Sequence, residues 1–174
     1  MVSDFFAEIG AASPIVLGPF GGLSSVGLAA TVTDAGGLGS YGLYGYDAVR
    51  IRATAEEIRA AASGPFALNI WLPIGDEVVP SDVDVDSAAR ALGTFFDEVG
   101  VTLPGAPERF LPSVGEQIAA VLDASPAVLS VVFGVPSAEL LSAAHARGFR
   151  VVGTATTVAE AIALDAAGVD AIVA

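Results

Sequence analysis

The side chains that enzymes use for covalent and acid–base catalysis are scarce in this sequence of 174 residues. It contains no cysteine, which excludes a thiolate nucleophile, an iron–sulfur cluster and a zinc–thiolate site within it. All seven basic residues are arginine, which excludes a Schiff-base lysine and the lysine of a P-loop. The single histidine, His145, falls late in an expected helix, where we expect a surface or helix-terminus role. We therefore assign no catalytic residue and expect a bound cofactor to supply the reactivity.

A glycine-rich turn is the first candidate for binding a cofactor. It follows the apolar run 14–17 and consists of Pro19, Phe20, Gly21 and Gly22. Glycines allow a flat ligand to approach the backbone closely, although an ordinary strand-to-helix turn uses the same residues. The spacing differs from the GxGxxG motif that binds phosphates.

Three polar or small residues close later apolar runs and are the remaining candidates. Asn69 stands in the run 66–72, where an unpaired buried amide would cost about 1–3 kcal/mol, so it either bonds neighbouring backbone or contacts a ligand. Trp71 beside it is interpreted as a packing residue. Gly134 is compatible both with a turn into the next helix and with close approach of a ligand. Thr156 or Thr157 is needed to cap the following helix, so the Thr154 hydroxyl is the one available for a ligand. In a parallel sheet these carboxyl ends share one edge, which is where ligands bind.

The elements that position these residues alternate between short β-branched runs and helical patterns, which is typical of parallel βα units. We expect strands at 14–17, 38–41, 66–70, 128–133, 150–154 and 170–174, with helices near 25–35, 55–62, 86–98, 114–123, 136–147 and 158–167. Capping boxes predict three helix starts, at Thr54–Glu57, Ser113–Glu116 and Thr157–Glu160. Six such strands amount to about three quarters of an eight-stranded TIM barrel. A flavodoxin-like open sheet is the alternative architecture.

The net charge of the sequence limits the classes of partner that it could bind. Twenty acidic residues against seven basic ones give a net charge of −13, which argues against nucleic acid or an anionic membrane as a partner. The uncharged run 9–33 is interrupted by prolines and glycines, and Asp4 and Glu8 are unlike a signal peptide, so a cytoplasmic protein is expected.

Residues 72–112 depart from the βα rhythm and are interpreted as an acidic insertion within one domain, 1–174. Asp82, Asp84 and Asp86 have the spacing of the start of a calcium loop. Ser87 and Gly93 stand where such a loop needs glycine and glutamate, so no metal site is assigned.

Six blocks of the sequence follow one another in a specific order: 14–22, 28–39, 66–69, 131–136, 152–157 and 166–174. They contain Gly18-Pro19-Phe20-Gly21-Gly22, Leu68-Asn69, Phe133-Gly134-x-Pro136 and Gly153-Thr154-Ala155-Thr156-Thr157. Together they resemble the nitronate monooxygenase family, whose members are FMN-dependent TIM-barrel enzymes.

The resemblance implies that the turn of Pro19, Phe20, Gly21 and Gly22 lies against the isoalloxazine and that Asn69 hydrogen-bonds the flavin ring. Gly134 and Thr154 would border the flavin or the substrate. The sequence departs from the family at Phe20, where methionine is usual, and at Val132, where some members carry histidine.

In the family, the Ala-Ile-Val-Ala of residues 171–174 leads into a segment that holds the proposed catalytic histidine, and later loops bind the FMN phosphate. The resemblance therefore implies that residues 1–174 need the C-terminal remainder of the barrel or a second chain, and that they are inactive alone. The implied activity is oxidation of alkyl nitronates, as small-molecule substrates, with O₂. The alternatives are an FMN-dependent enoyl or NAD(P)H:quinone reductase of the same family, or a non-catalytic barrel fragment that needs a partner segment.

Overall fold

The computed structural model describes residues 2–102, 105 and 107–174. The chain divides into two compact units, one formed by residues 1–74 and 113–174 and the other by residues 75–112.

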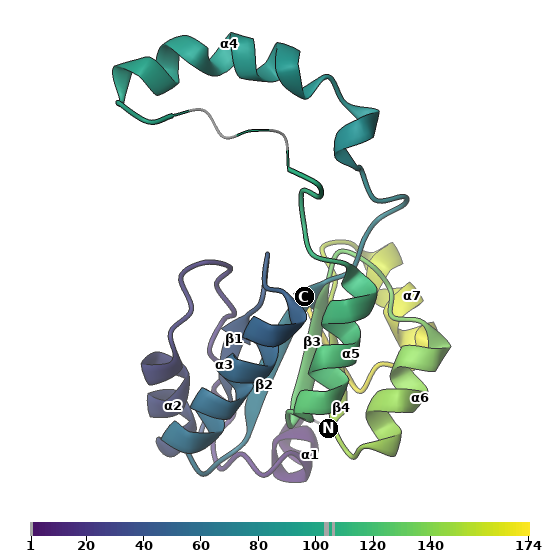
Figure 1. The fold of residues 1–174 in the computed structure, drawn as a ribbon. Helices are drawn as coiled ribbons and strands as arrows, with labels where there is room; N and C mark the ends of the chain where they lie inside the picture. The colour runs from purple at the N-terminus through teal and green to yellow at the C-terminus, as the bar shows by residue number, and fades with distance from the viewer. Residues whose placement is uncertain (1, 103–104, 106) are drawn as a thin grey trace. The chain divides into compact units, whose positions relative to one another are not determined.

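The first unit contains a five-stranded parallel sheet in which the strands follow one another in chain order (Figure 1). The strands are β1 (Gly39–Gly42), β2 (Phe66–Trp71), β3 (Val128–Val132), β4 (Arg150–Thr154) and β5 (Ala171–Val173). The helices are α1 (Val2–Glu8), α2 (Val26–Asp34), α3 (Ala48–Ala61), α5 (Val114–Ala124), α6 (Ala138–Ala146) and α7 (Val158–Ala167). Because every strand runs in the same direction, all the carboxyl ends lie at one edge of the sheet.

The strand expected at 14–17 forms only a single parallel bridge, between Val16 and Leu38. Two backbone hydrogen bonds flank it: Leu17 N–H donates to Leu38 O at 3.0 Å, and Leu38 N–H donates to Ile15 O at 2.8 Å. Pro14 has no N–H to donate, and Pro19 closes the run on the other side, so few residues remain to extend the ladder. The prediction of a full strand here is wrong.

One of the three predicted capping boxes forms. Thr157 Oγ1 accepts from Glu160 N–H at 3.2 Å, and the Glu160 carboxylate accepts from Thr157 N–H at 3.1 Å. Hydrogen bonds from the N–H and hydroxyl of Thr156 add to this and hold the pKa of Glu160 below its usual value.

The other two predicted helix starts differ from the structure. Thr54 lies buried inside α3, which begins at Ala48 because Asp47, a strong N-cap residue, accepts from Arg50 N–H at 2.8 Å. Ser113 does precede α5, but its side chain makes no capping hydrogen bond.

Alternation along the strands places different residues on the two faces of the sheet. The outer face carries the larger apolar cluster and packs against α3, α5 and α6, with Leu68, Ile70, Leu129, Val131 and Val151 contributed by the strands and Ile51, Ile58, Val121 and Leu141 by the helices. The opposite face, called the inner face below, carries a second cluster of Ala67, Val128, Val152, Leu38, Ile9 and Ala11. Asn69 and Trp71 follow Ala67 on this inner face.

The second unit consists of the 3₁₀ turn η1 (Pro80–Asp82) and the helix α4 (Val85–Glu98), close to the helix predicted at 86–98. Two of its acidic residues accept backbone hydrogen bonds at element starts: Asp84 accepts from Ser87 N–H at 2.9 Å, and Asp82 accepts from Val79 N–H at 3.3 Å. In the part of the chain that the structure describes, no group of three or more acidic or histidine side chains could hold a metal ion. The single-domain interpretation of 1–174 stays a prediction.

None of the described helices has both the length and the apolarity needed to cross a membrane.

A charged network occupies the amino ends of β4 and β5. The Asp170 carboxylate lies 2.8 Å from His145 Nε2, accepts from Val151 N–H at 2.7 Å and accepts from Arg150 Nη1 at 3.1 Å. Arg150 also contacts Glu8 at the end of α1, at 3.0 Å. Partial burial opposes ionisation of Asp170, but the Val151 N–H, His145 and Arg150 outweigh it and hold its pKa below the usual value. His145 therefore lies at the opposite end of the strands from the candidate site residues, as expected.

Replacing Asp170 with asparagine is expected to lower the free energy of unfolding by about 2 kcal/mol near neutral pH, because hydrogen bonds to a charged group contribute about 1.5–3 kcal/mol. Since the pKa of Asp170 is lower in the folded state, its contribution is complete above the ordinary carboxyl pKa and is lost as the pH falls through the folded value. Urea unfolding between about pH 7 and pH 2 should therefore show the two proteins converging below about pH 4. The exposed Asp123, which pairs with Arg52, provides the control: Asp123→Asn should change stability by less than about 1 kcal/mol. A difference for Asp170→Asn that stays constant down to pH 2 would contradict this account.

Candidate functional site

The glycine-rich turn after residue 17 is fixed to the carboxyl end of β1 by one hydroxyl, that of Ser24. Its Oγ donates to Phe20 O at 2.8 Å, accepts from Phe20 N–H at 3.2 Å and accepts from Gly42 N–H at 3.0 Å. These three bonds use the full donor and acceptor capacity of a hydroxyl. The sequence analysis missed Ser24, because nothing in the local pattern distinguishes it from Ser25, which caps α2.

The turn and β1 approach each other more closely than side chains would permit. A Cβ on Gly42 would stand 2.9 Å from the carbonyl carbon of Phe20 and 3.0 Å from Gly21 N. A Cβ on Gly21 would stand 3.2 Å from Tyr44 Cβ, and Gly22 has a φ of 77°, which favours glycine. The glycines of this turn are therefore required by the backbone, and they leave its surface free of side chains at Gly21 and Gly22.

Asn69 lies on the inner face, 3% exposed, and is paired with Ser130 of the neighbouring strand. Its Nδ2 donates to Ser130 Oγ at 3.1 Å and to Ser130 O at 3.3 Å. Because a carbonyl oxygen only accepts, this contact fixes the orientation of the amide and directs Asn69 Oδ1 away from Ser130. No described residue donates to Oδ1, and that atom is not fully buried. Asn69 therefore bonds its neighbour and leaves its carbonyl oxygen without a donor among the described residues, while its contact with a ligand stays a prediction.

Gly134 and Thr154 lie at the carboxyl ends of the next two strands. A Cβ on Gly134 would stand 2.8 Å from Leu72 Cβ and 3.2 Å from Pro73 O, so packing alone requires glycine there. Thr154 ends β4, half-buried, and its hydroxyl makes no hydrogen bond with any residue that the structure describes. As predicted, the capping of α7 is carried out by Thr157.

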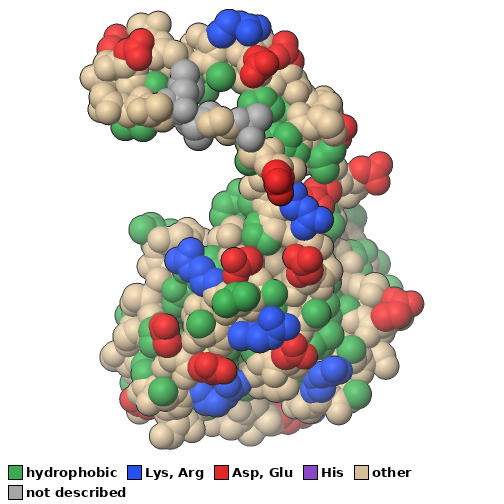
Figure 2. Space-filling view, in the orientation of Figure 1, with side chains coloured by type: hydrophobic (Ala, Val, Ile, Leu, Met, Phe, Trp, Pro, Cys, Tyr) green, Lys and Arg blue, Asp and Glu red, His purple; other side chains and the backbone are tan. Residues whose placement is uncertain are grey.

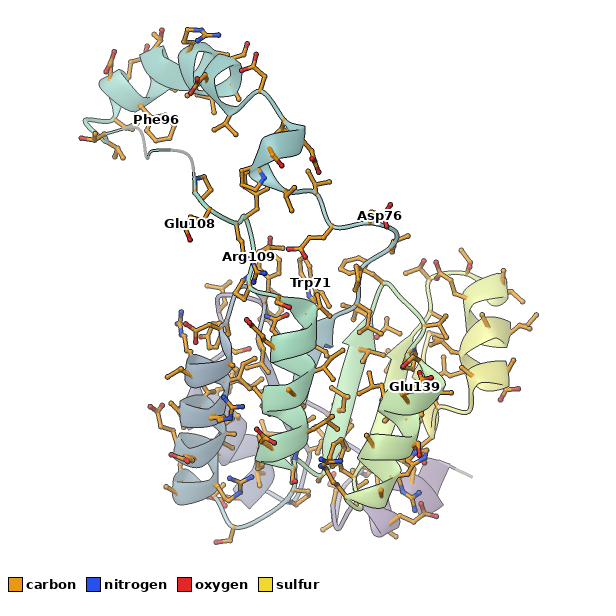
Figure 3. All side chains as sticks on the ribbon, turned by 45° about the vertical axis from the view of Figure 1, so that its right-hand side comes forward. Trp71, Asp76, Phe96, Glu108, Arg109 and Glu139 are labelled. Atoms are coloured by element: carbon orange, nitrogen blue, oxygen red, sulfur yellow. The ribbon has the colours of Figure 1, made fainter. Side chains whose placement is uncertain are left out.

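Aromatic rings line the same edge of the sheet. Trp71 lies 4.0 Å from Tyr44, centroid to centroid and tilted by 32°, and 4.9 Å from Phe133 in an edge-to-face contact. Figure 3 shows Trp71 at the carboxyl end of the sheet. Trp71 does pack, as predicted, against two further rings, but 39% of it stays exposed.

A family model described as nitronate monooxygenase matches residues 4–174, nearly the whole chain. The chain belongs to the nitronate monooxygenase family. The resemblance seen in the sequence is thereby confirmed.

Relatives and solved structures agree with this assignment. Nitronate monooxygenase of Paraburkholderia phytofirmans is 34% identical over 170 residues, which is 95% of this chain and 46% of the relative. Nitronate monooxygenase of Pseudomonas aeruginosa is 34% identical over 181 residues, covering 100% of this chain and 50% of that protein. The chain thus spans about half the length of the curated relatives it matches.

The nitroalkane oxidase of Streptomyces ansochromogenes superposes with a TM-score of 0.78 at 29% identity, over 96% of this chain and 47% of that structure. FabK of Thermotoga maritima superposes with a TM-score of 0.67 at 22% identity, over 98% of this chain and 42% of that structure, and shows the fold alone. With the parallel sheet, these matches confirm the predicted class, parallel βα units of a TIM barrel, and the sheet is open across the described strands.

The inner-face edge of this nitronate monooxygenase family member fits the ring of a flavin better than its phosphate. Gly21 and Gly22, which carry no side chain, and the Asn69 acceptor suit a flat ring that carries an N–H group, although Phe20 beside them is exposed. Each of the five arginines of the first unit is engaged elsewhere: Arg50 on the Tyr46 ring, Arg52 with Asp123, Arg59 with Ala124 O, Arg147 with Ala143 O and Arg150 with Asp170. Figure 2 shows acidic and basic side chains interspersed over the helices α3 and α5, on the outer face. Within this unit no arginine is left to bind a phosphate.

Proposed function

We propose that this chain forms one half of an FMN-dependent oxidoreductase that oxidises alkyl nitronates with O₂. In this proposal, the chain supplies the residues that contact the flavin ring. The observation that carries the proposal is the Asn69–Ser130 pair, which leaves an acceptor on the inner face, together with Gly21 and Gly22 in the turn that Ser24 holds against β1. Family membership supports the reaction class. FMN, when bound, supplies the redox chemistry.

The residues of this chain then act by binding and orientation. Asn69 Oδ1 accepts a hydrogen bond from an N–H of the flavin ring, and the backbone of Pro19, Phe20, Gly21 and Gly22 lies against the ring. Gly134 and the available Thr154 hydroxyl border the flavin or the substrate.

Binding of the FMN phosphate and transfer of the proton require groups from outside the strands and helices of the first unit. We propose that the remaining half of a barrel, in the same polypeptide or in a second chain, supplies a phosphate site and a catalytic base, with the cytoplasm as the proposed location. The lack of an available arginine in the first unit supports this division of roles.

In a complete barrel that contains this chain and is loaded with FMN, Asn69→Ala is expected to weaken FMN binding about tenfold, because the ring loses one hydrogen bond and Ser130 loses its partner. Flavin absorbance after dialysis, followed by titration with FMN, measures the loss. Gln117→Ala is the matched control, since Gln117 is also a buried amide but bonds Tyr46 O between the outer helices and β1.

Anaerobic addition of a nitronate, and separately of NAD(P)H, to the FMN-loaded complete barrel tests the reaction itself. We expect the nitronate to bleach the flavin and O₂ to restore its colour. Bleaching by NAD(P)H alone would replace this proposal with the reductase alternative, and unchanged FMN binding in a folded Asn69→Ala protein would remove Asn69 from the flavin site.

A further inference from the structure

Tyr44, Trp71 and Phe133 form a continuous row across the carboxyl ends of β1, β2 and β3, called the aromatic wall below. Their exposed fractions are 41%, 39% and 56%, which is high for large rings already in contact with one another. Contiguous exposed apolar surface is commonly found at ligand-binding and interaction sites.

The backbone departs from its usual conformation to place Phe133 in the wall. Val131 faces the outer cluster, so an extended chain would turn Phe133 to that same outer face. Instead Phe133 has a φ of 73°, and Gly134 N–H donates to Val132 O at 3.0 Å, which makes a strained γ-turn. The turn brings the ring against Trp71. Strain of this kind persists where the surrounding structure holds it, commonly at ligand sites.

The wall stands beyond the level of the Asn69–Ser130 pair. Trp71 follows Asn69 by two residues on the same face, so it lies about 7 Å further along the strand direction. A ligand that reaches Asn69 from the carboxyl edge therefore passes the wall.

The first-unit segments beside the wall carry no charged side chain of their own. The segments that follow the strands, residues 18–25, 43–46, 72–74, 133–137 and 155–157, contain no Asp, Glu, Lys, Arg or His. A carboxylate buried against these segments would lose its hydration without gaining a cation from them, whereas each buried methylene raises affinity about fourfold.

We infer that the aromatic wall binds the apolar substituent of the nitronate, so that the site selects long alkyl or aryl substrates over those that carry a carboxylate. The inference rests on the proposed function for the identity of the reacting group, and it assigns substrate selection to Tyr44, Trp71 and Phe133.

The first test uses fluorescence and needs no turnover. Trp71 is the single tryptophan of the chain, so its emission reports on the wall directly. We expect 1-nitrohexane to quench it with a Kd at least tenfold lower than that of 3-nitropropanoate, which has the same nitro group but a carboxylate in place of the alkyl end. Phe133→Leu should raise the Kd for 1-nitrohexane about threefold to fivefold. Ile162→Ala, which truncates an equally exposed apolar side chain on α7, should leave it unchanged.

Equal quenching by the two compounds, or no effect of the wall variants, would overturn the inference. If Phe133→Leu loses its circular dichroism spectrum because the γ-turn is disturbed, Tyr44→Leu serves as the second variant, since it removes a ring without touching that turn.

A second test uses this chain joined to the remaining half of a barrel and loaded with FMN, together with the nitronates of the same two compounds. We expect the kcat/KM ratio to favour the hexyl nitronate at least tenfold and to fall in Phe133→Leu. Equal turnover of both would refute the substrate selection while leaving the proposed function in place. Oxidation of neither would refute the proposed function, and the fluorescence titration would then decide by itself whether the wall binds apolar ligands.

Discussion

Gly39→Ala is expected to reduce the free energy of unfolding by about 3 kcal/mol, at the upper end of the range for an overpacked core. A Cβ at this position would fall inside van der Waals contact of Ala29 O and Thr33 Oγ1, both on α2. The buried Thr33 hydroxyl links three segments, since it accepts from Gly39 N–H at 3.2 Å and donates to Pro65 O at 3.0 Å. Because the obstacle is backbone rather than a flexible side chain, the helix itself must move. Urea denaturation measures the loss.

Gly27→Ala provides the control for this experiment. It lies in the first turn of the same helix, and a Cβ there meets nothing within 4 Å. Removing a helical glycine should stabilise the protein slightly, by up to about 1 kcal/mol. If Gly39→Ala unfolded at the same urea concentration as Gly27→Ala, the close packing of α2 on β1 would be wrong. Since α2 directly follows the turn held by Ser24, Gly39→Ala should also weaken FMN binding, whereas Gly27→Ala should not.

Sequence patterns predicted the elements well where the signal was local. The runs around 66–70, 128–133 and 150–154 became strands because apolar β-branched residues were followed by clear turn signals, and Thr157 and Glu160 formed their capping box. The pattern at Thr54 was misleading, because the same spacing arises by chance inside a helix that Asp47 had already started. Residues 14–17 had strand composition, but prolines at both ends limited the hydrogen bonding.

The candidate site was predictable only in part, because its decisive contacts join distant segments. Asn69 stood out as an amide in an apolar run, yet its partner Ser130 comes from the next strand, 61 residues later. Ser24 and Gly42 acquire their roles only once the turn lies on β1. The positive φ of Phe133 has no signal in the sequence, since phenylalanine does not favour that conformation.

The 174 residues by themselves are expected to bind FMN at least about 100-fold more weakly than the same residues joined to the second half of a barrel. They are also expected to show no nitronate-dependent oxygen uptake. Ring contacts and the Asn69 acceptor remain, but the first unit has no arginine available for the phosphate, and the chain contains no lysine. A charge-assisted hydrogen bond to phosphate is about twice as strong as a neutral one, so losing several of them outweighs what the ring contacts retain.

A chimaera supplies the comparison, with residues 1–174 fused to the second half of the Pseudomonas aeruginosa relative, whose first half this chain matches. Flavin absorbance, light scattering and oxygen consumption are measured on both proteins. The segment alone should also self-associate, because β5 pairs with β4 on one side only among the described strands and its other edge presents apolar residues and free backbone groups. In the chimaera this edge should be covered, so the protein should be monodisperse and yellow. A monodisperse, unfused segment that carries stoichiometric FMN and consumes oxygen would refute the division of the site between two halves. It would then follow that a phosphate can be held by groups other than the arginines of the first unit.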